Sequence, residues 1–115
     1  HLRVLREAVD TIYAENPEPS EKELRACAPL LGSVLEALRL YPSAPILART
    51  SKAWDLVAGL PVPAGSDVLV STWLLHRQRD IWEHADEFRP DRFLGEAASA
   101  IPRDAYLPFR TAYRT

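Results

Sequence analysis

The sequence predicts an α+β domain in which helices come first, short strands follow and a long irregular loop comes last. Three observations lead to this class. Apolar residues recur at helical spacing over residues 1–42, and extended, turn-rich segments occupy residues 43–76. Residues 77–109 carry charged and aromatic side chains without clear periodicity, and residues 110–115 form a short separate end. The 115 residues are enough for one small domain and not for two.

Composition narrows the classes of function. Hydrophobic residues make up 47% of the chain, which favours a packed core over disorder. The net charge of −2 gives no reason to expect a nucleic-acid partner. No apolar run reaches the length of a membrane span. The single cysteine excludes an internal disulfide and fits a reducing compartment, so we expect a cytoplasmic location.

The first two helices are predicted from periodicity and capping. Apolar side chains at helical spacing predict an amphipathic helix over about residues 2–14, which the proline-containing segment 15–19 ends. Ser20 followed by Glu23 forms a capping-box pattern, which predicts that a second helix begins near Glu21.

The third helix carries the first candidate site. Pro29 predicts a break, so we expect this helix to run over about residues 30–40, and it must stop at Tyr41 because a proline follows. Glu36 and Arg39 lie three residues apart and therefore share one helical face. Two readings stay open at this point: a weak, exposed pair, or a buried pair whose fork geometry is directional.

The middle of the chain is expected to hold short elements separated by turns. These are an extended segment at 45–50, two very short strands within 55–62, a strand at 67–71 and a single helical turn at 72–75.

The segment after these strands predicts an ordered irregular loop over 76–92. Its aromatic residues Trp82 and Phe88, together with Phe93 directly after it, would anchor it. The Ala/Gly/Ser-rich segment Leu94–Ala100 predicts a surface loop.

Three further side chains are best explained by packing. His76 has no second ligand candidate at metal-site spacing, so we expect a hydrogen-bonded structural histidine. Trp73, like Trp82, is expected to be a packing anchor, and Cys27 a small buried hydrophobe.

Taken in order, these motifs resemble the C-terminal part of a cytochrome P450, the family of haem-thiolate monooxygenases. The resemblance covers roughly residues 2–109. It rests on a Glu-x-x-Arg motif and the segments that follow it: Glu36 and Arg39, Leu40-Tyr41-Pro42, Arg49, Pro63–Gly65, Asp67–Ser71, Trp73–Arg77, Phe88–Phe93 and Tyr106–Phe109. Each motif alone is weak, but their common order is specific.

The resemblance implies a partial cytochrome P450 fold over residues 1–115. The first helix would be the J helix of the family and the third its K helix. The irregular segment within 77–109 would be the loop called the meander. We therefore expect the chain to be one piece of a longer protein, without the upstream oxygen-activating helix.

The resemblance also implies roles for individual residues. No catalytic residue and no metal ligand is assigned. The implied roles are a structural core beneath the haem for Glu36, Arg39 and Arg92, cofactor contacts for Arg49, Phe109 and Arg114, and substrate-pocket lining for Ile46 and Leu47. On the residues alone, Arg49 also fits a solvated strand residue, and Arg92 a surface charge.

The end of the chain departs from the family pattern, Phe-x-x-Gly-x-Arg-x-Cys. Phe109 and Arg114 match, whereas Arg110 and Ala112 stand where glycines are expected, and the cysteine would be residue 116. That thiolate is the axial ligand that favours O–O cleavage. Cys27 lies outside this context and is not expected to replace it. We therefore expect this chain alone to be inactive and not to bind haem.

Three functions stay open on the sequence. The first is a fragment of a monooxygenase that activates O₂ on haem and hydroxylates an apolar small molecule, with electrons from a redox partner. The second is a non-catalytic relative that has lost haem and stabilises another enzyme. The third is a free-standing α+β interaction domain. Apolar faces on the leading helices also predict self-association.

Overall fold

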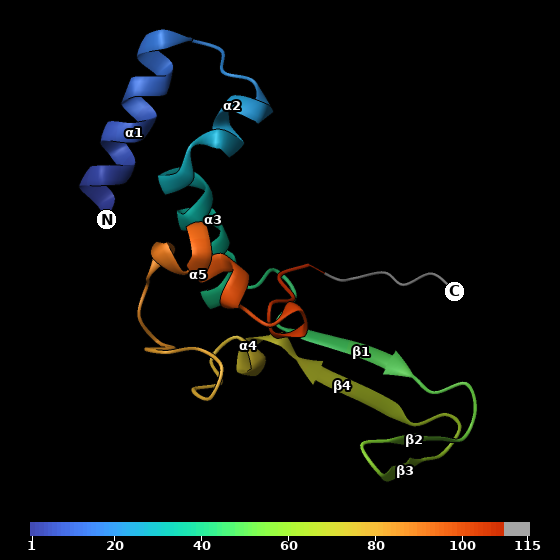
Figure 1. The fold of residues 1–115 in the computed structure, drawn as a ribbon. Coiled ribbons are helices and arrows are strands. Elements are labelled where there is room, and N and C mark those ends of the chain that lie inside the picture. The colour runs from blue at the N-terminus through green and yellow to red at the C-terminus, as the bar shows by residue number, and fades with distance from the viewer. Residues whose placement is uncertain (110–115) are drawn as a thin grey trace.

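The computed structural model describes residues 1–109, and its elements confirm the predicted α+β class (Figure 1). Three helices lead the chain, α1 (Leu2–Glu15), α2 (Glu21–Ala26) and α3 (Ala28–Leu40). Two separate two-stranded sheets follow, and short helical segments alternate with loops after them. Within the described part of the chain, no helix is both long and apolar enough to cross a membrane.

The start of α2 carries the predicted capping box. The Ser20 hydroxyl accepts a hydrogen bond from the Glu23 backbone N–H at 3.3 Å, and Glu23 Oε2 accepts one from the Ser20 N–H at 2.7 Å. Two backbone donors that the helix itself cannot satisfy thus gain acceptors, which fixes the first residue of α2.

The break before α3 lies earlier than predicted. The chain leaves helical geometry at Cys27 (φ −74°, ψ 94°), and Pro29 lies within the first turn of α3 instead of interrupting it. A proline is tolerated there because the backbone N–H that it lacks has no acceptor in the first turn. Cys27 is only half-buried, and α3 ends at Leu40 as expected.

The strands form two antiparallel pairs. In the first, β1 (Ile46–Thr50) pairs with β4 (Asp67–Ser71), so that Arg49 lies opposite Val68. In the second, β2 (Asp55–Val57) pairs with β3 (Leu60–Val62). Ala58 and Gly59 join β2 to β3 with φ of 50° and 79°. Positive φ at both turn residues matches the right-handed twist of a tight hairpin.

The second half of the chain contains one helix that was not expected. The helical turn α4 (Thr72–Leu75) is where it was predicted, but Leu94–Ala100 is not a loop, because α5 (Gly95–Ala100) lies there. Three of its six residues are alanine, the strongest helix former, and Glu96 lies in the first turn, where a negative charge is favourable. Two 3₁₀ segments, η1 (Pro90–Phe93) and η2 (Arg103–Ala105), flank it.

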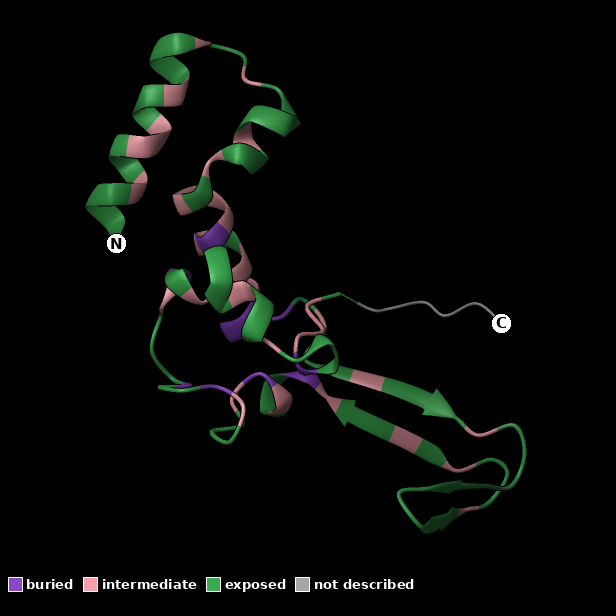
Figure 2. Ribbon diagram, in the orientation of Figure 1, coloured by how far each residue is buried: buried purple, intermediate pink, exposed green. Residues whose placement is uncertain are grey.

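The core is small and aromatic. It contains the buried residues Trp82, Ala85, Phe93 and Ala105, and Tyr106 packs against Phe93 with ring centroids 4.8 Å apart. Figure 2 shows buried residues gathered where α3 meets the loops after α4, while both strand pairs and α1 are mostly exposed. The predicted anchor role of Trp82 and Phe93 is thus confirmed.

Trp73 and Phe88 do not anchor the core as Trp82 does. Trp73 is 45% exposed, and the Arg77 guanidinium lies 4.2 Å from the centroid of its ring. Phe88 is also exposed.

A close approach between α3 and η1 depends on Gly32. A Cβ atom at this position would lie 2.8 Å from the Pro90 carbonyl oxygen and 3.2 Å from the Leu94 side chain. No side chain fits at that distance without a backbone shift, so Gly32 sets how closely α3 and η1 pack.

Candidate functional site

Glu36 and Arg39 form a buried, two-pronged ion pair on α3. Arg39 Nε donates to Glu36 Oε2 at 2.7 Å, and Arg39 Nη2 donates to Glu36 Oε1 at 2.8 Å. Both side chains have an exposed fraction of 0%. Of the two readings that the spacing left open, the structure shows the buried pair. A fork-to-fork contact of this kind is directional and holds both side chains in one geometry.

The remaining donors of Arg39 hold a loop that is distant in sequence. Nη1 donates to the His76 carbonyl at 2.6 Å and to the Ala85 carbonyl at 2.7 Å, and Nη2 donates to the Glu87 carbonyl at 3.1 Å. Together with the two bonds to Glu36, all five N–H donors of the guanidinium have acceptors. One buried cation therefore orders the backbone of the irregular loop.

Arg92 reaches the same carboxylate from η1. Its Nε lies 3.2 Å from Glu36 Oε1, and its Nη2 donates to the His84 carbonyl at 2.8 Å. The Arg89 backbone N–H also donates to Glu36 Oε1, at 2.9 Å. The Arg92 side chain is only 11% exposed, so it is not a surface charge. A carboxylate shared by two guanidiniums has its lone pairs satisfied, which lowers the cost of burying it.

His76 is a second buried polar residue of this site. Its ring is fully buried, with Nδ1 3.0 Å from the Arg39 carbonyl oxygen and Nε2 2.8 Å from the Leu107 backbone N. The predicted hydrogen-bonded structural histidine is thus confirmed. Burial lowers the pKa of His76, and the nearby charges of Arg39 and Arg77 lower it further, against the hydrogen bond to the Arg39 carbonyl, which raises it. No spacing pattern in the sequence indicated its contact with Leu107.

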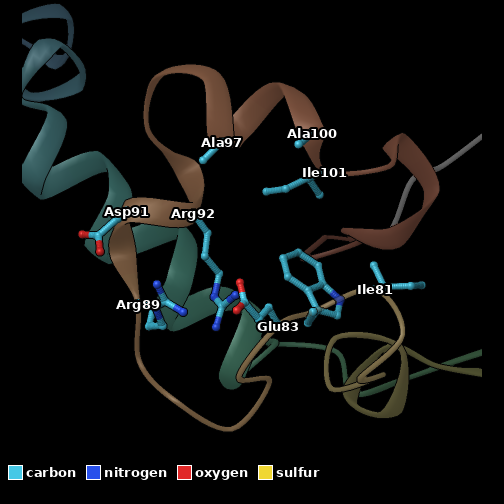
Figure 3. A pocket seen from close by; sticks show the side chains of 9 residues that line it. Ile81, Glu83, Arg89, Asp91, Arg92, Ala97, Ala100 and Ile101 are labelled. Atoms are coloured by element: carbon cyan, nitrogen blue, oxygen red, sulfur yellow. The ribbon is translucent and has the colours of Figure 1, made fainter.

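Beside this core lies an open pocket of about 290 Å³ between the loop and α5 (Figure 3). Trp82 and Ile101 form apolar parts of its wall. Glu83 and Asp91 oppose the charges of Arg89 and Arg92, so the polar part has no dominant sign; the remaining lining residues are Ile81, Ala97 and Ala100. Across the described residues, no group of three or more His, Cys, Asp or Glu side chains could hold a metal ion.

The residues predicted to contact cofactor and substrate lie on β1 and near the end of the chain. Arg49 is exposed, and its Nη1 donates to the Ala48 carbonyl at 3.2 Å. Ile46 is 59% exposed and Leu47 half-buried. Side chains alternate along a strand, so Leu47 and Arg49 share one face of β1 and Ile46 lies on the other.

Of the two predicted contacts at the end of the chain, only Phe109 lies among the described residues. Phe109 is 62% exposed, and Arg114, together with Arg110 and Ala112, lies outside the described residues. The structure thus unites Glu36, Arg39 and Arg92. Arg49 and Phe109, the predicted cofactor contacts among the described residues, form no hydrogen bond or ion pair with these three side chains.

Arg49 and Leu47 have the side-chain chemistry that one edge of a haem would need. The exposed Arg49 guanidinium has N–H donors that a carboxylate could accept, and Leu47 places apolar surface on the same face of the strand. The described residues near β1 include no cysteine that could bind iron. Cys27 is the only cysteine of the sequence, and it lies between α2 and α3. Figure 1 shows β1 near the opposite end of α3 from this junction.

Comparison with known proteins places this arrangement in a family. Residues 1–111 match the family model described as cytochrome P450. The chain is 41% identical over 106 residues to cytochrome P450 3A27 of Oncorhynchus mykiss, across 91% of the chain and 20% of that protein. It is 32% identical over 110 residues to the chloroplastic carotene epsilon-monooxygenase of Arabidopsis thaliana, across 95% of the chain and 20% of that protein.

A bacterial relative, cyclooctatin synthase of Streptomyces melanosporofaciens, is 43% identical over 74 residues, or 64% of the chain and 16% of that protein. The chain spans about a fifth or less of the length of these curated relatives. The family match extends over nearly all of the sequence, including both arginines and the glutamate of the buried core. The chain belongs to the cytochrome P450 family.

Proposed function

We propose that this chain is the part of a haem-dependent monooxygenase that builds the support beneath the cofactor. The observation that carries the proposal is the buried core of Glu36, Arg39 and Arg92, in which Arg39 uses every N–H donor. Such a network costs much to bury and stabilises little by itself, so its benefit lies in holding a defined geometry. We assign it a structural role and no catalytic one.

The core acts on the backbone of the meander. Arg39 holds three carbonyls from His76 to Glu87, and Arg92 holds the His84 carbonyl. His84 has a φ of 49°, which is unfavourable for a residue with a side chain. Fixing four carbonyls of one irregular loop to two guanidiniums lets that loop keep a single shape without regular secondary structure.

Three arginine and aromatic side chains are proposed as cofactor contacts. When bound, haem supplies the iron at which O₂ is activated. Arg49 would pair with a propionate carboxylate through its exposed guanidinium. Phe109 and Arg114 would contribute an apolar contact and a second cation, at the positions where the family loop has the same residue types. A thiolate ligand for the iron would have to come from outside these 115 residues.

The proposed substrate is an apolar small molecule, and the reaction is insertion of one oxygen atom to give a hydroxyl group. Of the two residues predicted to line the substrate site, Leu47 shares the Arg49 face of β1 and would line one wall. Ile46 lies on the opposite face of the strand and would line a different part of the site. The carotene epsilon-monooxygenase relative supports this class, because its name gives a carotene, an apolar molecule, as its substrate. Electrons would come from a separate redox partner.

Self-association of the isolated chain is proposed from its exposed apolar surface. No residue of α1 is buried, and Leu2, Val4 and Tyr13 are 72%, 52% and 48% exposed. Sedimentation velocity should show dimers or larger species at micromolar concentration. A monomer over the whole accessible range would contradict this part of the proposal.

The test of the proposed function is an absorbance titration with haemin, followed by reduction under carbon monoxide. The longer protein that contains this chain should give the long-wavelength thiolate signature, and the isolated 115-residue chain should not. In the longer protein, Glu36→Gln should abolish the signature, whereas Glu21→Gln, at an exposed site on α2, should leave it unchanged. A longer protein that binds no haem would overturn the proposal and favour a haem-less partner protein.

A further inference from the structure

The His76 ring bridges two segments that are far apart in sequence. Nδ1 faces the carbonyl oxygen of Arg39, 37 residues earlier, and Nε2 faces the N–H of Leu107, 31 residues later. The His76 carbonyl in turn accepts from Arg39 Nη1. His76 is therefore joined to Arg39 by two hydrogen bonds, and its ring links the Glu36–Arg39–Arg92 core to the backbone of Leu107.

The two contacts together define the state of the ring. The Leu107 N–H can only donate, so Nε2 must be the unprotonated acceptor. The Arg39 carbonyl can only accept, so Nδ1 must carry the hydrogen. Only the neutral ring with its proton on Nδ1 satisfies both. The other neutral tautomer would lose both bonds, and the doubly protonated ring would lose the bond to Leu107.

The segment that receives this contact has a second link to the same helix. The Tyr106 hydroxyl donates to the Leu35 carbonyl on α3 at 2.8 Å. The Tyr106 and His76 rings also lie 5.4 Å apart. The backbone just before Phe109 is thus linked to α3 at two neighbouring residues, Tyr106 and Leu107. Of the two links, only the one through His76 depends on the tautomer of a ring.

We propose that His76 is a positioning residue that fixes the backbone leading into the haem loop relative to the Glu36–Arg39–Arg92 core. It acts through Leu107 and touches neither haem nor substrate. That the segment after Leu107 is a haem loop rests on the proposed function; the bridge from Arg39 to Leu107 does not. The same ring would release Leu107 on acidification, because a protonated Nε2 and the Leu107 N–H are both donors.

The groups around the ring favour the neutral form. Arg39 of α3 and Arg77, which follows α4, both place cations near it, and Trp82 and Tyr106 cover it with aromatic surface. The carboxylate of Glu36, which pairs with Arg39, has both oxygens bound by arginine side chains. A positive charge on His76 would therefore add to the charges of Arg39 and Arg77, while the charge of Glu36 is already balanced by arginines.

The first experiment is nitrogen-15 NMR of the uniformly labelled chain, which reports both the histidine rings and the backbone amides. We expect the His76 signals of a neutral ring with the hydrogen on Nδ1 at pH 7, and slow solvent exchange of the Leu107 amide. Acidification should lower the protection factor of the Leu107 amide, which is its exchange rate relative to an unfolded peptide at the same pH, before it lowers the protection of amides in the middle of α3. A ring protonated on Nε2, or a Leu107 amide that exchanges as fast as a free peptide, would overturn the inference.

Two variants separate positioning from general stabilisation. The Asn side chain of His76→Asn reaches the place of Nδ1 and keeps the donor to Arg39, but it offers nothing at Nε2. The Gln side chain of His76→Gln can place its oxygen near Nε2 and accept from Leu107, but it loses the Nδ1 donor. We expect Leu107 exchange to be about 2- to 12-fold faster in the Asn variant than in the Gln variant, the range for one hydrogen bond.

Equal Leu107 exchange in both variants would show that His76 only packs and would refute a positioning role. If the Asn variant does not fold, the tautomer measurement on the wild-type chain still decides the question. In the haem-loaded longer protein, the Asn variant should lose the thiolate signature faster at pH 6 than the Gln variant. An absent signature in the wild-type protein would instead refute the proposed function and leave the NMR result standing.

Discussion

Replacing Glu36 by glutamine tests the buried core most directly, because it keeps the size of the side chain and removes its charge. Four N–H donors point at the carboxylate, from Arg39 Nε and Nη2, Arg92 Nε and the Arg89 backbone. A glutamine retains one oxygen, so its NH₂ group must face at least one of these donors. Two guanidiniums with little or no exposure would be left without a countercharge.

Breaking a buried ion pair by removing one partner costs about 3–5 kcal/mol of unfolding free energy. At roughly 4 °C per kcal/mol for a domain of this size, Glu36→Gln should lower Tm by about 12–20 °C. Circular dichroism melting against the unaltered chain measures this shift. A complete loss of the folded baseline at 25 °C would agree with the same reasoning if the chain is only marginally stable.

The matched control is Glu21→Gln on α2. Glu21 also pairs with an arginine, Arg25, at 2.7 Å, but the two side chains are 78% and 71% exposed. An exposed pair of this kind contributes at most about 0.5 kcal/mol, so Tm should change by about 2 °C or less. If Glu36→Gln lowered Tm no more than Glu21→Gln does, burial would not govern the strength of the core, and the argument would fail.

Three further predictions concern packing, pH and one hydrogen bond. Gly32→Ala should destabilise the chain by about 1–3 kcal/mol, because its Cβ would meet the Pro90 carbonyl at 2.8 Å. The control is Val34→Ala, a truncation at an exposed neighbouring position, which should cost far less. Equal urea midpoints for the two variants would contradict the close packing. Because the pKa of His76 is lowered in the folded chain, the unfolded chain, with a histidine pKa near 6.5, binds a proton that the folded chain does not. The free energy of unfolding should therefore fall as pH drops below about 6.5, which urea melts from pH 8 to pH 5 can test. His76→Gln should remove this dependence of stability on pH. Tyr106→Phe should lower the free energy of unfolding by about 1 kcal/mol, because the hydroxyl hydrogen bond to α3 is lost. Burial raises the pKa of Tyr106, so its phenol should stay un-ionised at pH 11 while the fold persists, which absorbance titration can follow.

Much of the local structure was predictable because it depends on residues that are close in sequence. The capping box at Ser20 and Glu23 and the strand Asp67–Ser71 lie where the sequence predicts them. Glu36 and Arg39 share one helical face whatever surrounds them, since three residues make nearly one turn. Two local predictions were wrong. Pro29 was expected to break a helix, but a proline in the first turn is compatible with one. Small residues were expected to make Leu94–Ala100 a loop, but its alanines favour the helix α5.

Burial was not predictable from local pattern. Trp73 and Trp82 are the same residue type in one stretch of chain, yet only Trp82 is buried, because only there does the chain fold back over α3. The sequence likewise left Glu36 and Arg39 open between an exposed and a buried pair. Nothing near Gly32 signalled that the Pro90 carbonyl would lie against it.

By itself, then, the sequence determined the order of elements, the capping of α2 and the placement of an acid and a base on one face of α3. These follow from hydrogen bonds and periodicities that span a few residues. The tertiary structure alone decided that the pair is buried and that the His76 ring joins Arg39 to Leu107. Both depend on where segments 31 to 56 residues apart return in space, and therefore on the packing of the whole chain.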